Sequence, residues 1–110
     1  MKTNFIYISG AITGIDNWEN QFDEAEKKIY KDCKNPVQVI NPRRLSDEVN
    51  ALFKILNAIP EYADYLRYDI KNLIDCNTIY MLKGWSKSKG ACLEYQIAKT
   101  LGLKIIGAEK

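Results

Sequence analysis

Short apolar segments alternate with longer amphipathic ones along the 110-residue chain, and this alternation restricts the fold more than any other feature of the sequence. Four short apolar segments are typical of buried strands: residues 4–9, 37–40, 78–82 and 103–106. Because helical segments separate them, the strands must pair in parallel through right-handed crossovers rather than through hairpins. We therefore expect an α/β fold with a small, doubly wound parallel sheet of about four strands, in the order 2-1-3-4, and helices on both faces.

The helical segments are recognised by apolar spacing and by their boundaries. Apolar residues recur every three or four positions from 18 to 29, and Asp16 with Glu19 predicts a capping box before them. A second stripe covers residues 49–56, and Pro60 is expected to end that helix and begin another that continues to about residue 75. A last helix is expected over about 88–101. Three loops follow strands, at the edge of the sheet where ligands bind: 10–16, 41–46 and 84–90.

The composition excludes several kinds of chemistry. The chain has no histidine, which rules out Ser-His-Asp and Cys-His pairs and the HExxH zinc motif. Sixteen basic and fourteen acidic residues leave a net charge of +2, which favours neither a nucleic-acid polymer nor a membrane as partner. The three cysteines include no CxxC pair, so we expect no disulfide framework, no metal site and a cytoplasmic location. The length suits a single domain over residues 1–110.

Two carboxylates fall where the helices should bury apolar groups. On a helical wheel, Asp69 and Glu94 each lie near the middle of an apolar face. These faces are formed by Tyr62, Leu66, Ile70 and Leu73 in one helix and by Ala91, Ile97, Ala98 and Leu101 in the other. A buried, unpaired carboxylate costs several kcal/mol or shifts its pKa, so two of them favour a functional site. The alternative is that Arg67, Lys71 or a tyrosine hydroxyl satisfies each acid.

The positions of these acids predict different roles. Glu94 lies within the first two turns of its helix, where the macrodipole favours an ionised nucleophile. Asp69 would then be the acid of raised pKa that donates a proton or orients the substrate. Two carboxylates without a metal or histidine are typical of glycosyl transfer. Strand alternation places Phe5, Tyr7 and Ser9 on one face, so the Tyr7 hydroxyl either holds Glu94 or simply packs.

The loops allow two interpretations each. Gly10 and Gly14 frame a turn that is neither a GxGxxG fingerprint nor a P-loop, and it is either a plain turn or a ligand cradle. Residues 84–90 place two serines and two lysines before a helix, which suits either a phosphate or a simple capping serine with solvated lysines. Trp85 either stacks on a base or packs down as a lid.

Four sequence elements together resemble a known family: YISG at 7–10, INP at 40–42, Asp69, and IYMLKGWSKSKGACLEYQIAKTLGL at 79–103. Over nearly its whole length the chain resembles the DUF4406 family of small bacterial and phage proteins, within the nucleoside 2-deoxyribosyltransferase-like superfamily. The resemblance implies a flavodoxin-like fold, no cofactor, and a homodimer to which the apolar helix around residues 52–56 contributes.

The resemblance also implies roles for individual residues. Glu94 is the nucleophile, Asp69 the partner acid and Tyr7 the residue that holds the glutamate. Ser88 matches a serine that contacts the 5′-phosphate in deoxynucleoside monophosphate N-glycosidases. Thr13 stands where those hydrolases have a phosphate-contacting arginine, for which Arg43, Lys87 or Lys89 would substitute. The expected substrate-binding residues are Ser9, Gly10, Ile12, Gly14, Asn41, Arg43, Trp85, Ser88 and Gly90.

The expected function is cleavage or transfer of the N-glycosidic bond of a (deoxy)nucleoside or its 5′-monophosphate, through a glycosyl-enzyme intermediate on Glu94. Two alternatives on the same fold stay open: a non-catalytic nucleotide-binding or sensing module, and an NAD glycohydrolase of the TIR type. A plain interaction protein is a third, and it would have Asp69 and Glu94 each paired to a basic side chain.

Overall fold

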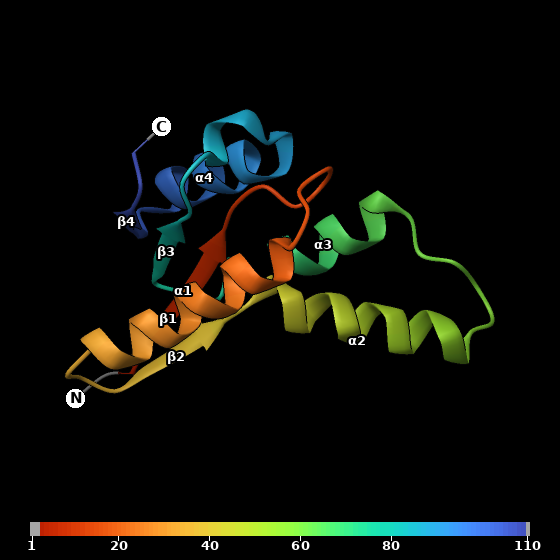
Figure 1. The fold of residues 1–110 in the computed structure, drawn as a ribbon, viewed down its shortest axis with the longest axis horizontal. Coiled ribbons are helices and arrows are strands. Elements are labelled where there is room, and N and C mark those ends of the chain that lie inside the picture. Colours follow the sequence, from red (N-terminus) through yellow and green to blue (C-terminus); the bar gives the residue numbers. More distant parts are fainter. Residues whose placement is uncertain (1–2, 110) are drawn as a thin grey trace.

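A parallel sheet forms the centre of the molecule (Figure 1). The computed structural model describes residues 3–109, and within them four strands pair in the order β2-β1-β3-β4. The strands are β1 (Asn4–Ser9), β2 (Val37–Ile40), β3 (Thr78–Met81) and β4 (Lys104–Gly107). All three pairings are parallel. The predicted α/β fold and strand order are therefore confirmed.

Helices cover both faces of this sheet because β1 alternates between them. Ile6 and Ile8 point to the face covered by α1 (Trp18–Asp32), where Phe22 and Ile29 complete one core. Tyr7 is buried in the second core, on the opposite face. That face is covered by the start of α2 (Pro42–Ile55), by α3 (Tyr62–Leu73) and by α4 (Lys89–Leu101).

Two predicted helix boundaries are wrong. Asp16 and Glu19 do not form a capping box, because α1 begins after Asn17, whose backbone is left-handed (φ 59°) and whose side chain caps nothing. Residues 41–46 are not a loop. The Asn41 side chain accepts a hydrogen bond from the Arg43 N–H, and a proline follows in the first helical position, so α2 starts directly after β2.

The next boundary also differs from the prediction. Pro60 lies in the connection after α2 rather than in the first turn of α3. Glu61 is instead the N-cap of α3, and it forms a capping box with Asp64, whose carboxylate accepts from the Glu61 N–H at 2.8 Å.

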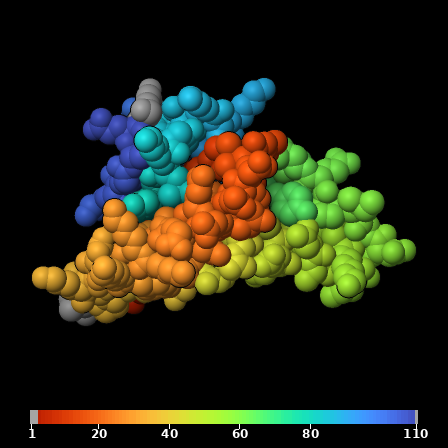
Figure 2. Space-filling view, viewed as in Figure 1, coloured from red at the N-terminus to blue at the C-terminus, as the bar shows by residue number. Residues whose placement is uncertain are grey.

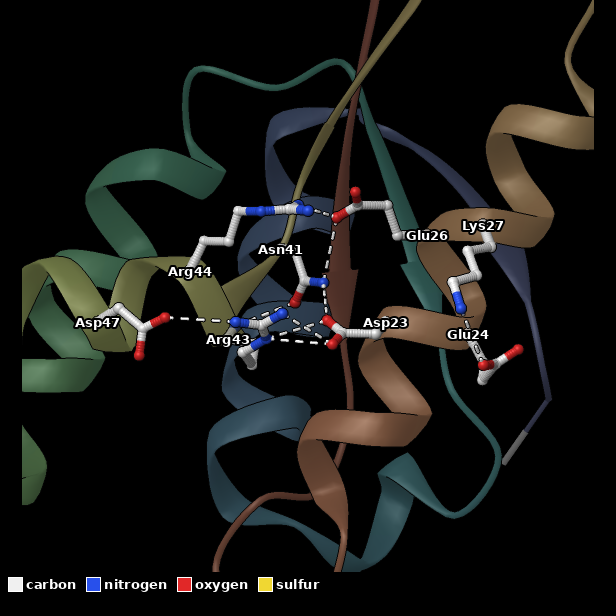
Figure 3. A network of polar contacts seen from close by, with 8 residues as sticks. All are labelled: Asp23, Glu24, Glu26, Lys27, Asn41, Arg43, Arg44 and Asp47. Atoms are coloured by element: carbon white, nitrogen blue, oxygen red, sulfur yellow. Dashed lines mark hydrogen bonds and ion pairs between the residues drawn. The ribbon is translucent and has the colours of Figure 1, made fainter.

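A polar network joins the first half of α1 to the start of α2 (Figure 3). The Arg43 guanidinium donates to both Asp23 oxygens, at 2.9 to 3.2 Å, and holds the pKa of Asp23 below its usual range. The Asn41 amide donates to both Asp23 and Glu26, and Glu26 also accepts from Arg44. Because both helices border the pocket described below, this network fixes the distance between two of its walls.

The far end of α2 extends beyond the sheet together with the connection to α3 (Figure 1). Apolar side chains are exposed there: Leu52, Ile55, Leu56 and Ile59, of which Ile55 is 81% and Ile59 88% exposed. Among the residues that the structure describes, no helix is long and apolar enough to cross a membrane.

Candidate functional site

A pocket of about 380 Å³ lies at the carboxyl end of β1. Its walls come from the loop after β1, the first turn of α1, and helices α2, α3 and α4, as expected for a doubly wound sheet. The lining residues are Gly10, Ile12, Thr13, Trp18, Ser46, Asn50, Tyr62, Tyr65, Leu66, Asp69, Ser88, Gly90, Ala91 and Glu94. Both carboxylates that the helical wheels singled out therefore border the same cavity.

Glu94 is held in place by two hydroxyl groups from β1. The Tyr7 hydroxyl donates to Glu94 Oε2 at 2.6 Å, and the Ser9 hydroxyl donates to Oε1 at 2.7 Å. Tyr7 and Ser9 lie two residues apart on one strand, so strand alternation directs both toward α4. Glu94 is only 5% exposed, and burial raises its pKa to about 7 although both hydroxyl bonds act to lower it.

Asp69 is buried without a basic partner. It is 8% exposed on α3, and within residues 3–109 its carboxyl group forms no ion pair with a basic side chain. The two candidates for neutralising it point elsewhere, because Arg67 pairs with Asp64 in solvent and Lys71 is exposed. Burial, and then the negative charge of Glu94, raise the pKa of Asp69 to about 8.

The two acids are coupled. Burial raises the pKa of each, and the charge of Glu94 further opposes the ionisation of Asp69. With its pKa raised to about 8, Asp69 keeps its proton at neutral pH. Burial and Glu94 raise the pKa of Tyr7 well above its usual value, so its hydroxyl stays a donor.

One premise of the sequence prediction needs correction. The helix macrodipole was expected to favour ionised Glu94, but burial raises the pKa of Glu94 to about 7. The pKa of Asp69 is also raised, to about 8.

Four of the expected substrate-binding residues line the pocket, and a fifth lies directly behind it. Gly10, Ile12, Ser88 and Gly90 contribute to the walls. Ser88 is also the N-cap of α4, and its hydroxyl accepts from the Ala91 N–H at 3.2 Å. Ser9 is fully buried and acts on the pocket only through its bond to Glu94.

The other four expected residues lie outside the pocket. Gly14 provides a left-handed turn (φ 77°) in the loop after β1. Asn41 and Arg43 belong to the network between α1 and α2, and Arg43 borders a neighbouring hollow that shares Trp18, Ser46 and Asn50 with the pocket. Trp85 is 3% exposed and is not a platform for a base: it stacks on Tyr95 at 4.5 Å, and its ring N–H donates to the Ala108 carbonyl.

Sequence reasoning missed most of the pocket wall opposite α4. Trp18, Ser46 and Asn50 come from α1 and α2, and Tyr65 on α3 donates to the Asn50 amide oxygen. One signal was available. Three residues precede Asp69 at helical spacing: Tyr62, Tyr65 and Leu66, by seven, four and three positions. They share its helix face, so they were expected to line the same cavity as Asp69.

Two residues of the predicted apolar helix faces are exposed. Tyr62 on α3 and Leu101 on α4 were expected to be buried, but they are 56% and 54% exposed.

These features define a class: a small doubly wound α/β domain with a pair of buried carboxylates in a pocket at the strand ends. The chain belongs to the family described as Domain of unknown function (DUF4406), which matches residues 4–107. A search of curated proteins finds none that matches the chain.

Proposed function

We propose that this protein is a member of the nucleoside 2-deoxyribosyltransferase-like superfamily and breaks the N-glycosidic bond of a (deoxy)nucleoside or its 5′-monophosphate. The observation that carries the proposal is the state of Glu94. Its carboxylate is held by two hydroxyls, is paired with no basic group in residues 3–109, and borders a pocket that also contains Asp69, whose pKa burial raises to about 8. A carboxylate used only for structure would be expected to have a basic partner.

In the first step, a Glu94 oxygen attacks C1′ of the sugar and forms a glycosyl ester. The bond between C1′ and the base nitrogen breaks, and its electron pair leaves with the base. Asp69 donates its proton to the departing base, so a neutral base leaves and Asp69 becomes ionised. The hydroxyls of Tyr7 and Ser9 hold the carboxylate in position throughout.

In the second step, the ionised Asp69 takes a proton from a water molecule or from a second base. That nucleophile attacks C1′, the ester bond breaks, and Glu94 leaves as a carboxylate. Attack by water gives hydrolysis, and attack by a base gives transfer. Both reactions start from the same intermediate, in which Glu94 carries the glycosyl ester and Asp69 is ionised.

The remaining walls suit a nucleoside in size and chemistry. Trp18 and Tyr65 supply aromatic surface on which a base can stack. Ser88 and Gly90 lie at the start of α4, where free N–H groups favour the oxygen atoms of a 5′-substituent.

The direct test is to incubate the protein with deoxynucleosides, ribonucleosides, their 5′-monophosphates and NAD, and to measure free base by chromatography. We expect Glu94→Gln to lower release at least about a thousandfold, because the nucleophile is lost while its volume is kept. The matched control is Glu24→Gln, which changes an exposed acid on α1 and should leave activity unchanged.

The outcomes separate the alternatives. Mass spectrometry of acid-quenched protein should show one glycosyl group, and peptide mapping should place it on Glu94. Base release that survives Glu94→Gln would contradict the proposal. Tight binding of a nucleoside without any turnover would favour a sensing module, and release of nicotinamide alone would favour the NAD glycohydrolase.

We also propose that the protein is a homodimer that buries the exposed end of α2. Leu52, Ile55, Leu56 and Ile59 form an apolar surface of the kind that marks association sites. Sedimentation should give a dimer, and Ile55→Lys with Ile59→Lys should give a folded monomer. A wild-type monomer at micromolar concentration would contradict this proposal.

A further inference from the structure

A second hollow, of about 750 Å³, opens beside the carboxylate pocket. The two cavities share four wall residues: Thr13, Tyr62, Ser88 and Gly90. The loop after β1 and the segment before α4 lie side by side at this place, as the space-filling view shows in orange-red and cyan (Figure 2). A ligand in the pocket can therefore extend past Ser88 and Gly90 into this second hollow, which we call the lysine groove.

The lysine groove is lined by Lys83, Lys87 and Lys89 and by no acidic side chain. Among residues 3–109, none of these three lysines forms an ion pair. Other cations do form such pairs, because Arg43, Arg44 and Arg67 each contact a carboxylate. The groove thus gathers three unneutralised positive charges in a protein whose net charge is only +2.

The segment that carries these lysines is anchored to the protein interior by a buried side chain. Trp85 is buried between Lys83 and Lys87, stacks on Tyr95 and donates to the Ala108 carbonyl. The turn Trp85–Lys87 is closed by a hydrogen bond from the Ser88 N–H to the Trp85 carbonyl at 3.0 Å. The lysine backbones are therefore held at the rim before any ligand arrives, which lowers the entropy cost of binding.

We propose that the lysine groove binds the second and later phosphates of the substrate, so that the preferred substrate is a nucleotide with at least two phosphates on its 5′-oxygen. This inference rests on the proposed function only for the position of the sugar over Glu94. We orient the sugar with its 5′-end toward Ser88 and Gly90, because these residues line both cavities and the groove begins there. The shared chemistry is a pyrophosphate, and a nucleoside di- or triphosphate or a dinucleotide such as NAD supplies it.

The physical signature is a dependence on phosphate number and on salt. Each exposed lysine contributes modestly at high dielectric, so we expect about a threefold loss of affinity for each lysine removed. All three together should give about a tenfold or greater preference for a diphosphate over a monophosphate at low salt. The preference should shrink between 50 and 300 mM salt, because exposed ion pairs are screened.

The experiment measures binding to the Glu94→Gln protein, in which the substrate is not consumed. The probes are the four deoxynucleosides with their mono-, di- and triphosphates, and NAD, titrated without divalent metal by calorimetry. The test variant is Lys83→Gln/Lys87→Gln/Lys89→Gln. The matched control is Lys28→Gln/Lys31→Gln/Lys34→Gln, which removes the same charge at the other end of α1 and in the turn after it.

We expect affinity to rise from mono- to diphosphate, the rise to vanish in the test variant, and the control to keep it. Equal affinity for mono- and diphosphates, or a rise that survives the test variant, overturns the inference. Preference for NAD over every nucleoside diphosphate supports it with the dinucleotide as source, and the reverse preference supports the simpler nucleotide.

Failure of the proposed function has a different readout. In that case the protein with Glu94 intact releases no base from any probe, while the order of affinities can still be measured. If only this inference fails, base is released as readily from nucleosides and monophosphates as from diphosphates, and the lysine variant has full activity.

Discussion

Replacing Asp69 with asparagine should make the protein more stable than wild type, by an amount that grows as the pH rises. The folded state keeps the Asp69 proton up to about pH 8, whereas an unfolded aspartic acid has a pKa near 3.8. Folding therefore takes up a proton between these values, and wild-type stability from this group is present below about pH 4 and is lost as the pH rises toward 8. Asparagine has nearly the same shape and no charge, so the variant lacks this loss.

The magnitude follows from the size of the shift. A change of about four pKa units, at about 1.4 kcal/mol each, sets an upper limit of about 5–6 kcal/mol. Asp69 borders a pocket that reaches solvent, so we expect about 1–3 kcal/mol at pH 8 and close to zero near pH 3. For a domain of this size, that corresponds to about 5–15 °C in Tm.

The assay is urea unfolding of wild type and Asp69→Asn at several pH values from 3 to 8.5. Asp32→Asn, which removes an exposed acid at the end of α1, is the matched control and should show no such growth with pH. A stability difference that is independent of pH would refute the reasoning. So would a variant that becomes less stable than wild type as the pH rises, because Asp69 would then be ionised and satisfied in the folded state.

Three further predictions concern the site and its supports. The proposed chemistry needs an ionised Glu94 and a protonated Asp69, so base release should show a bell-shaped pH profile with limbs near 7 and 8. A plateau of activity from pH 5 to 10 would contradict it. Tyr7→Phe removes a hydrogen bond that lowers the pKa of Glu94, so the acid limb of this profile should move to higher pH. An unchanged acid limb would mean that this bond does not affect the pKa of Glu94. Arg43→Ala breaks the paired contact with Asp23 and should lower the urea midpoint of unfolding. Arg67→Ala, whose side chain is mostly in solvent, should lower it less, and an equal effect of the two variants would contradict this reasoning.

The sequence was sufficient for the sheet because its signals are local. Each strand is a short apolar run, each crossover contains a helix, and chirality leaves few orders for four parallel strands. The two acids were also visible locally, since a helical wheel needs only the spacing within one helix. The same local reasoning failed at residues 41–46 and at Trp85. An asparagine before a proline was treated as a loop although it caps a helix. Trp85 was expected to stack on a base or to pack down as a lid, but it is buried against Tyr95 and donates to the Ala108 carbonyl.

The sequence by itself therefore determined the strand order, the helix faces and the presence of two carboxylates on apolar faces. Only the tertiary structure decided that Asp69 and Glu94 border one pocket, because that depends on how α3 and α4 pack against β1. It also decided that Tyr7 and Ser9 hold Glu94, and that burial raises its pKa. Desolvation depends on every neighbour of a group at once, and those neighbours come from segments far apart in the sequence, such as β1 for Glu94 on α4.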